Sequence, residues 1–258
     1  MSANYSELPG KVAVVTGAAR GMGATFAEGL LAEGINVVGA DRDFAAMSAT
    51  AERINSQDVQ GATLVPLEVD VTSQAEQNAL ADSAIKHFGR LDFWINNAGV
   101  FPQTGVLDIT PEELELTFRV NVFAAVYGVQ AAARVMGDHG GSIVNIGSVA
   151  SLRVRSTWLS YSASKAALEH LTKFQALELG ARAIRVNTIA PGYIDTDMTA
   201  WLHETPDALD KALEGIPMGR LGTPQDILDS VLFLLSDSSS YMSGTTHVVD
   251  GATRHKFV

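Results

Sequence analysis

The chain has 258 residues, no cysteine, 18 Lys and Arg against 29 Asp and Glu, and a formal net charge of −11. The missing cysteines exclude disulfides and cysteine metal sites, and a surface this acidic repels a phosphate backbone, so we expect no nucleic-acid partner. Hydrophobic residues make up 47% of the chain and charged residues 18%, which is the composition of a globular protein and not of a disordered one.

The N-terminal stretch MSANYSELPG has no apolar core behind a basic start, so the sequence predicts no secretory signal. The longest apolar runs, such as VLFLL at 231–235, are far too short to span a bilayer. A chain without cysteine also fits a reducing compartment. We therefore expect a cytoplasmic protein with no membrane partner.

Short apolar runs alternate with longer helical patterns along the whole chain. The runs predict strands at 11–16, 35–40, 62–69, 91–96, 141–147, 184–190 and 246–250. Their nearly continuous apolar character is typical of parallel strands that are covered on both faces. The helical patterns lie at 21–33, 44–55, 73–88, 111–136, 158–180 and 224–236. The alternation predicts an α/β, doubly wound Rossmann fold: a mostly parallel seven-stranded sheet with helices on both faces, in a single domain over 1–258.

The first strand turns into the first helix through TGAARGMG, residues 16–23. Gly17, Gly21 and Gly23 depart from the G-x-G-x-x-G spacing, yet glycines here let the backbone approach a pyrophosphate at a helix start. Asp41 ends the second strand, where a carboxylate accepts hydrogen bonds from ribose hydroxyls and disfavours a 2′-phosphate. Glycines alone also make ordinary turns, and Asp41 alone is a common cap. Together, in this order, they predict a dinucleotide site.

Tyr161 and Lys165 stand four residues apart in SYSASK, residues 160–165. Side chains at this spacing are neighbours on one face of a helix. The spacing is common, so two ordinary neighbours explain it as well as a catalytic pair does. The remaining motifs decide between the two interpretations.

Seven motifs together resemble the short-chain dehydrogenase/reductase family over essentially the whole chain. They are TGAARGMG (16–23), DVT (70–72), NNAG (96–99), Asn121, Ser148, YSASK (161–165) and PGYIDT (191–196). The interval from Ser148 to Tyr161 is also typical of the family. The resemblance implies an oxidoreductase that interconverts a secondary alcohol and a ketone by hydride transfer with a nicotinamide cofactor. It favours the catalytic interpretation of SYSASK.

The resemblance assigns roles to four catalytic residues. Tyr161 would exchange a proton with the substrate oxygen and Ser148 would hydrogen-bond the same oxygen, so both would bind substrate. Lys165 would hold the nicotinamide ribose and lower the pKa of Tyr161, whose ordinary value of about 10 is too high for neutral pH. Asn121 would bind a water that links Lys165 to solvent.

The resemblance also implies that the cofactor contacts several loops. The expected cofactor residues are Gly17, Arg20, Gly21, Met22, Gly23, Asp41, Arg42, Asp70, Val71, Asn97, Ala98, Gly99, Tyr161, Lys165, Pro191, Gly192, Ile194 and Thr196. Arg20 and Arg42 argue for NADP, because basic residues at these positions often accompany that preference in the family. Asp41 occupies the ribose position itself, while both arginines can turn to solvent. We therefore expect NAD to be preferred over NADP.

Two other functions remain open, a non-catalytic dinucleotide-binding sensor or scaffold and a 3-oxoacyl-thioester reductase that uses NADP. An epimerase or dehydratase is disfavoured, because relatives of that kind usually carry an additional C-terminal substrate domain. No metal is expected, since the six histidines are isolated and no H-E-x-x-H spacing occurs.

The sequence leaves the small-molecule substrate undecided. Residues 193–220 mix Met, Trp, Pro and Gly, and we expect them to form a mobile substrate flap. Apolar residues near the motifs would suit a cyclic, aromatic or alkyl ketone; these are Val149, Leu152, Trp158, Tyr193, Met198, Trp201 and Leu202. Arg153 and Arg155 would instead hold a carboxylate, unless they are simply solvated.

The helix predicted at 111–136 is apolar around much of its circumference, and a sheet covers only one side of a helix. The family commonly pairs this helix and the 158–180 helix across a two-fold axis. We therefore expect a homotetramer.

Overall fold

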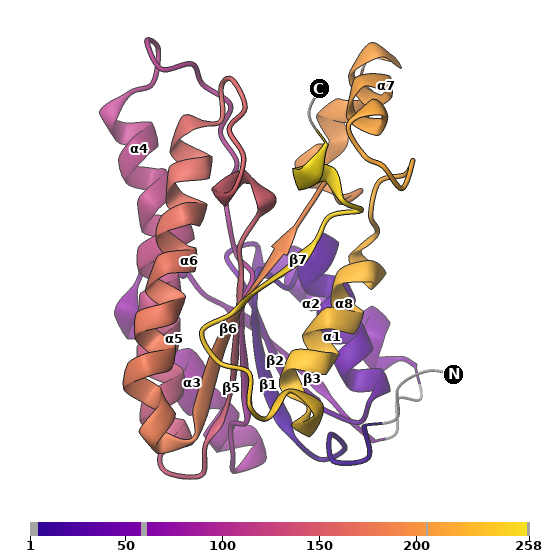
Figure 1. Ribbon diagram of the computed structural model, residues 1–258. Coiled ribbons are helices and arrows are strands. Elements are labelled where there is room, and N and C mark those ends of the chain that lie inside the picture. Colours follow the sequence, from indigo (N-terminus) through magenta and orange to yellow (C-terminus); the bar gives the residue numbers. More distant parts are fainter. Residues whose placement is uncertain (1–4, 58–60, 205, 257–258) are drawn as a thin grey trace.

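The computed structural model describes residues 5–57, 61–204 and 206–256, built around one seven-stranded sheet (Figure 1). The strands are β1 (Val12–Thr16), β2 (Asn36–Asp41), β3 (Leu64–Glu68), β4 (Phe93–Asn96), β5 (Gly141–Ile146), β6 (Ile184–Pro191) and β7 (Thr246–Val249). They are ordered β3-β2-β1-β4-β5-β6-β7, and every neighbouring pair is parallel. The predicted seven-stranded doubly wound fold is confirmed.

Helices cover both faces of the sheet, as predicted. They are α1 (Gly21–Ala32), α2 (Phe44–Asn55), α3 (Gln74–Phe88), α4 (Pro111–Phe118), α5 (Ala124–Met136), α6 (Leu159–Leu179), α7 (Pro206–Glu214) and α8 (Pro224–Leu235). One face carries α1, α2 and α8, and the other carries α3, α5 and α6 (Figure 1). Among the described residues, no helix combines the length and the apolar character that crossing a membrane requires.

The inner strands of the sheet contribute side chains to two apolar cores, one on each face. Successive side chains of a strand point to opposite faces, and in β1 Ala13 and Val15 pack in one core while Val12 and Val14 pack in the other. All four side chains are essentially inaccessible to solvent. Burial on both faces explains why the strands read as continuous apolar runs.

The strand order reverses between β1 and β4. The chain runs outward from β1 through β2 to β3, then crosses back to β4 and continues to β7. At such a switch point the loops after the two central strands part and leave a crevice at the carboxyl ends. The motifs at 16–23 and 96–99 are the segments where β1 and β4 end, so the fold brings both to this crevice.

The single helix predicted at 111–136 is wrong in detail, because the structure divides it. Its start is confirmed, since Thr110 caps α4. A π-helical turn at Arg119–Phe123 then separates α4 from α5, and the Ala124 N–H donates to the Arg119 carbonyl, five residues back. Turns of this type inside helices are frequent at functional sites.

The predicted flap at 193–220 contains regular structure. It holds a 3₁₀-helical segment (Asp197–His203) and α7, while Thr205 lies outside the described residues. Nothing in the fold tests whether this segment moves, so its mobility stays a prediction.

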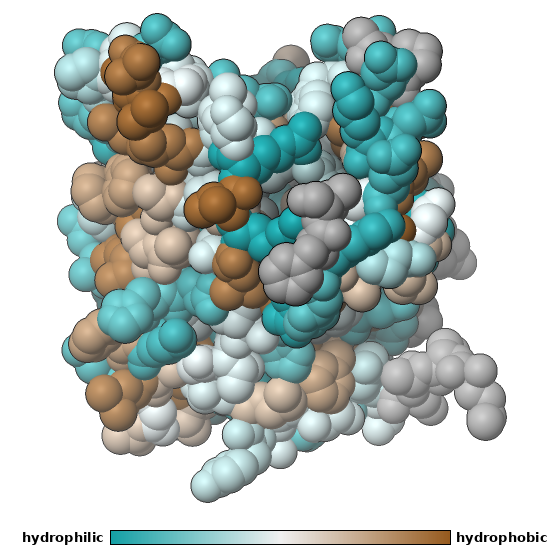
Figure 2. All heavy atoms as spheres, turned by 45° about the horizontal axis from the view of Figure 1, so that its top comes forward, coloured by the Kyte–Doolittle hydropathy of each residue, from teal (hydrophilic) through white to brown (hydrophobic). Residues whose placement is uncertain are grey.

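One flank of the fold keeps apolar side chains exposed. Leu116 and Phe123, from α4 and the π-helical turn, are 54% and 46% exposed, and Phe174 and Leu177 of α6 are 51% and 79% exposed. Figure 2 shows apolar side chains gathered on the side that α4 and α6 occupy in Figure 1. The sheet contacts α6 on its other side, while α4 packs against α6 and the π-helical turn, and this flank is left bare.

Candidate active site

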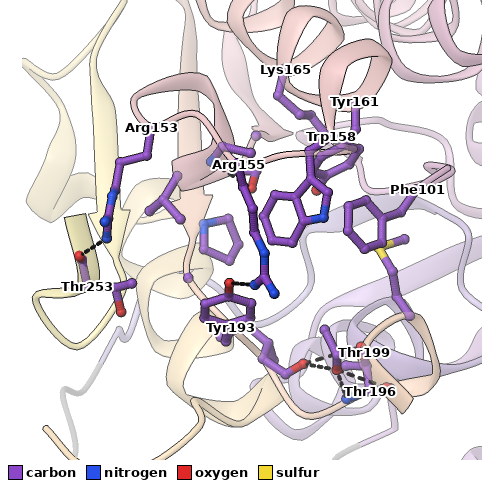
Figure 3. A pocket seen from close by; sticks show the side chains of 18 of the residues that line it. Phe101, Arg153, Arg155, Trp158, Tyr161, Lys165, Tyr193, Thr196, Thr199 and Thr253 are labelled. Carbon is purple, nitrogen blue, oxygen red and sulfur yellow. Dashed lines mark hydrogen bonds between the residues drawn. The ribbon is translucent and has the colours of Figure 1, made fainter. Parts of the chain in front are cut away.

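A cavity of about 310 Å³ opens at the carboxyl ends of β5 and β6 (Figure 3). The predicted site residues that line it are Met22, Asn97, Gly99, Ser148, Tyr161, Lys165, Pro191, Gly192, Ile194 and Thr196. They come from the first turn of α1, the loops after β4 and β5, the end of β6 with the loop after it, and α6. The structure therefore brings Ser148, Tyr161 and Lys165 together, in a space at the lower end of the range for small-molecule sites.

The other predicted cofactor residues continue along the same edge of the sheet. Gly17, Arg20, Gly21 and Gly23 follow β1, Asp41 and Arg42 lie at the end of β2, Asp70 and Val71 follow β3, and Ala98 follows β4. Because all the strands are parallel, these positions form a row that leads away from the cavity. A row of this kind suits an extended dinucleotide.

Where β1 turns into α1, the positions of Gly17 and Gly23 are packed too tightly to admit a side chain. Gly17 and Gly21 have positive φ angles of 65° and 55°, and a Cβ on Gly23 would lie 2.0 Å from the Gly17 carbonyl oxygen. Asn97 Nδ2 fixes this loop by donating to the carbonyl oxygens of Thr16 and Gly17, at 2.9 Å and 3.1 Å. No side chain caps the start of α1, which leaves its first N–H groups for a phosphate.

Asp41 is oriented by two backbone groups. Its Oδ2 accepts from Ala19 N at 3.2 Å, and its Oδ1 accepts from Asp43 N at 3.0 Å. Asp43, which the sequence analysis missed, caps α2 and pairs with Arg20 at 2.7 Å. Arg20 is exposed to solvent, as expected, and there it pairs with the carboxylate of Asp43. Its position just before the helical pattern at 44–55 could have identified Asp43 as a helix cap from the sequence.

Tyr161 and Lys165 lie on one face of α6, and both are buried. The Tyr161 ring packs edge-on against Phe101, with ring centroids 4.6 Å apart. Lys165 Nζ lies 5.7 Å from the centroid of the Tyr161 ring and donates to the Ile146 carbonyl at 2.8 Å. Ser148 stands two residues after β5 and lines the same cavity as Tyr161. The three predicted side chains form one buried cluster.

The expected lowering of the Tyr161 pKa is not found in the structure. Burial raises the pKa of Tyr161, and the nearby Ser148 hydroxyl opposes that rise. Burial also lowers the pKa of Lys165 to about 8, because a low-dielectric interior disfavours each charged form. The direction is opposite to the expected one, because the phenol is desolvated and the Lys165 ammonium donates to the Ile146 carbonyl.

Asn121 lies in the π-helical turn, and its side chain orders the loop after β4. Its Nδ2 donates to the Val100 carbonyl at 2.9 Å and to Ser164 Oγ at 3.0 Å, while its Oδ1 accepts from Val100 N at 2.9 Å. A second cavity, of about 10 Å³, is bordered by Asn121 and Lys165. A space of this size holds about one water, and the water expected beside Lys165 stays a prediction.

The residues proposed for the substrate pocket divide into two groups. Val149, Trp158, Tyr193, Met198 and Trp201 line the cavity, as do Arg153 and Arg155. Leu152 and Leu202 do not: Leu152 is 46% exposed, and Leu202 is completely buried inside the fold. Their place in the predicted pocket is therefore wrong, because one side chain faces solvent and the other serves the core.

The cavity also contains residues that the sequence analysis missed. Those with polar or aromatic side chains are Phe101, Thr199, Lys211 and Thr253. Phe101 follows the NNAG motif closely, and that position was a usable signal. Thr253 had none, because it reaches the cavity only through the segment after β7, where its carbonyl accepts a hydrogen bond from Arg153. Among the described residues, no three His, Asp or Glu side chains are grouped to hold a metal ion.

Known proteins resemble this chain over nearly its whole length. A family model described as enoyl-(acyl carrier protein) reductase matches residues 17–253. The trans-4-hydroxycyclohexanecarboxylate dehydrogenase of Sinomonas cyclohexanicum is 39% identical over 244 residues, which cover 93% of this chain and 92% of the relative. A solved short-chain type dehydrogenase/reductase from Mycobacterium ulcerans matches with a TM-score of 0.93 at 29% identity, covering 96% of this chain and 91% of that one.

A third similarity concerns a structure with bound ligands. A 7α-hydroxysteroid dehydrogenase, solved with NADH and 7-oxo glycochenodeoxycholic acid, matches with a TM-score of 0.89 at 35% identity and covers 97% of each chain. Fold, motif geometry and these similarities agree. The chain belongs to the short-chain dehydrogenase/reductase family of nicotinamide-dependent oxidoreductases.

Proposed function

We propose that this protein interconverts a cyclic secondary alcohol and its ketone by hydride transfer with NAD. The observation that carries the proposal is the buried cluster of Tyr161, Ser148 and Lys165 in a cavity with aromatic walls. The named relatives support the substrate class, since one is named for a cyclohexane alcohol and another was solved with a ring ketone. Flat faces such as those of Trp158 and Phe101 suit a ring.

The nicotinamide supplies the chemistry of the hydride, and the protein handles the proton. Ser148 orients the substrate oxygen, and Tyr161 takes its proton during oxidation or returns one during reduction. Because burial raises the pKa of Tyr161, the phenol is protonated at neutral pH, which is the form that ketone reduction needs. Lys165, with a pKa of about 8, is mainly cationic at neutral pH and borders the one-water cavity, a route by which Tyr161 exchanges its proton with solvent.

A panel of alcohols tests this function against its alternatives. The protein is mixed with NAD and, separately, with small secondary alcohols, cyclic diols and a 3-hydroxyacyl thioester, and NADH formation is followed. The proposal requires oxidation of cyclic secondary alcohols. Turnover of the thioester alone, with NADP, would favour the 3-oxoacyl-thioester reductase, and NADH binding without turnover of any alcohol would favour a sensor.

The residues at the sheet edge fit a dinucleotide. Gly17 and Gly23 approach so closely that a Cβ on Gly23 cannot be accommodated, which leaves a bare backbone for a pyrophosphate. We propose that NAD is preferred over NADP, because Asp41 stands at the end of β2 and two backbone N–H groups hold its carboxylate in position. Arg20 is neutralised by Asp43 and so offers little attraction to a 2′-phosphate.

The cofactor preference is testable at Asp41. A carboxylate about 4 Å from a 2′-phosphate costs roughly 1–4 kcal/mol per unit charge, between full and partial screening, so kcat/KM should favour NAD by roughly tenfold or more. Asp41→Asn keeps the size of the side chain and removes its charge, and Asp41→Ala removes both. Both variants should lower the ratio of kcat/KM with NAD to kcat/KM with NADP. Equal kcat/KM values with NAD and NADP in the wild type would contradict the proposal.

We propose a homotetramer as the assembly. The exposed Leu116, Phe123, Phe174 and Leu177 support it, because they form one apolar flank along α4 and α6, which contact each other. Covering this flank with a second copy removes apolar area from water, which is favourable. Light scattering at micromolar concentration should give four times the chain mass, and a monomeric mass would refute the assignment. A cytoplasmic location stays a prediction from the sequence.

A further inference from the structure

The cavity is cationic although the protein is strongly acidic. The chain carries a net charge of −11, yet the charged side chains that line the cavity are Arg153, Arg155, Lys165 and Lys211, and among the described residues no Asp or Glu joins them. A cleft lined by one sign of charge concentrates ligands of the opposite sign. Lys165 belongs to the catalytic cluster, so three cations remain to be explained.

Arg155 lies over aromatic rings, without a carboxylate partner. Its Cζ is 4.9 Å from the ring centroid of Trp158, 5.3 Å from that of Trp201 and 5.9 Å from that of Tyr193. Its Nη1 donates to the Tyr193 hydroxyl (Figure 3). Among the described acids, none forms an ion pair with it. Stacking orders the guanidinium and leaves most of its donors for a ligand.

The backbone that presents Arg155 is strained. Thr157 has a φ of 69°, a region that β-branched residues rarely adopt. The turn that it closes lets Trp158 N donate to the Arg155 carbonyl at 3.2 Å, and the arginine side chain then folds back over the indole. Strain of this kind persists where the surrounding structure enforces it, commonly at ligand-binding sites.

Trp158 connects Arg155 with the catalytic tyrosine. Its ring centroid lies 6.5 Å from that of Tyr161 and 4.9 Å from the Arg155 Cζ. A substrate with its oxygen at Tyr161 and its body along the indole therefore reaches Arg155 if it is about the size of one ring. Trp201, whose ring contacts the same guanidinium, has a buried Nε1 with no hydrogen-bond partner among the described residues, which is a further donor for an anionic group.

We propose that Arg155 binds a carboxylate on the substrate, so that the preferred substrates are ring-sized secondary alcohols or ketones that carry a carboxylate opposite the reacting carbon. A guanidinium fork matches the two oxygens of a carboxylate. Arg153, the other candidate from the sequence, donates to the Thr253 carbonyl and is turned away from Arg155 (Figure 3). This inference rests on the proposed function and specifies its substrate class.

The test compares 4-hydroxycyclohexanecarboxylate with its methyl ester, which has the same ring and hydroxyl but no charge. With NAD, kcat/KM of the wild type should be at least tenfold higher for the acid. Arg155→Gln should lower kcat/KM for the acid by roughly 10- to 100-fold, the range of a lost hydrogen bond to a charged group, and change the ester by less than twofold. Arg153→Gln removes an equal charge from the same cavity but leaves Arg155 in place, so it should lower the ratio of acid to ester far less than Arg155→Gln does.

Each outcome decides the proposal. The proposal is overturned if the wild type has equal kcat/KM values for the acid and the ester. It is also overturned if Arg155→Gln lowers both values equally, or if Arg153→Gln lowers kcat/KM for the acid as much as Arg155→Gln does. If the wild type oxidises only uncharged alcohols, the inference fails while the proposed function stands. If it oxidises neither compound, cyclohexanecarboxylate and its amide are titrated with NADH present, following the fluorescence of Trp158 and Trp201. Tighter binding of the acid that disappears in Arg155→Gln then supports the inference, and its absence overturns it.

Discussion

Replacing Tyr161 by Phe should lower turnover by at least ~10²–10⁴, the usual contribution of a general acid or base. The change keeps the ring, and with it the edge-on contact to Phe101 at 4.6 Å, but it removes the only phenol in the buried cluster that reaches the substrate oxygen. NADH binding should change little, because the glycine loop and Lys165 remain in place. Steady-state kinetics with a cyclic secondary alcohol, beside an NADH titration, measure both quantities.

The matched control is Tyr127→Phe on α5, which makes the same chemical change outside the cavity. It should leave both turnover and NADH binding near the wild-type values. If Tyr161→Phe instead keeps near-normal turnover, then Tyr161 and Lys165 are only neighbours on a helix, and the proton must be transferred by another group.

Replacing Lys165 by Met should reduce turnover and cofactor affinity together. The Nζ of Lys165 is the buried cation of the cluster, held by the Ile146 carbonyl at 2.8 Å and close to the Tyr161 ring. A lost hydrogen bond to a charged group costs about 1.5–3 kcal/mol, so NADH should bind roughly tenfold to a hundredfold more weakly. A variant that loses turnover but binds NADH normally would contradict a role in holding the cofactor.

Comparing the wild type with Lys165→Met shows how the lysine makes the free energy of unfolding depend on pH. Folding lowers the pKa of Lys165 from 10.5 to about 8, so between these pH values the unfolded chain binds more protons than the folded one, and stability from this residue rises with pH. Below pH 8 the buried Lys165 is charged in the folded state, and this lowers the free energy of unfolding by about 3 kcal/mol, at 1.36 kcal/mol per pKa unit. Relative to Lys165→Met, the wild type should therefore gain free energy of unfolding between pH 7 and 10.5. A constant difference in denaturant titrations would show that the lysine is not desolvated.

Much of the fold follows from local pattern. Strands buried on both faces must be apolar throughout, and this made β1 to β7 visible in the sequence. The π-helical turn was not visible, because it accompanies hydrogen bonds between Asn121 and Val100, a contact that the sequence pattern does not specify. A long apolar helix is predicted equally well with or without such a turn.

In the candidate active site too, some features could be predicted from the sequence and others could not. The positions of Ser148, Tyr161 and Lys165 followed from motif order, because each motif ends a strand at one edge or lies on α6. The direction of the Tyr161 pKa did not follow, since it depends on burial and on the placement of Lys165. The pairing of Arg20 with Asp43 and the exposure of Leu152 depend on how loops pack, and a local pattern does not encode that.

In the proposed reaction a hydride passes from the carbinol carbon of the substrate to the nicotinamide while Tyr161 takes the proton. A single turnover with 4-hydroxycyclohexanecarboxylate or its methyl ester, deuterated at the carbinol carbon, follows this hydride when the NADH product is analysed by mass spectrometry and NMR. The deuterium should be found at C4 of the nicotinamide in the wild type, and Tyr161→Phe should form almost no labelled NADH in the same time. NADH without deuterium, or no NADH from a protein that binds NAD, would contradict it.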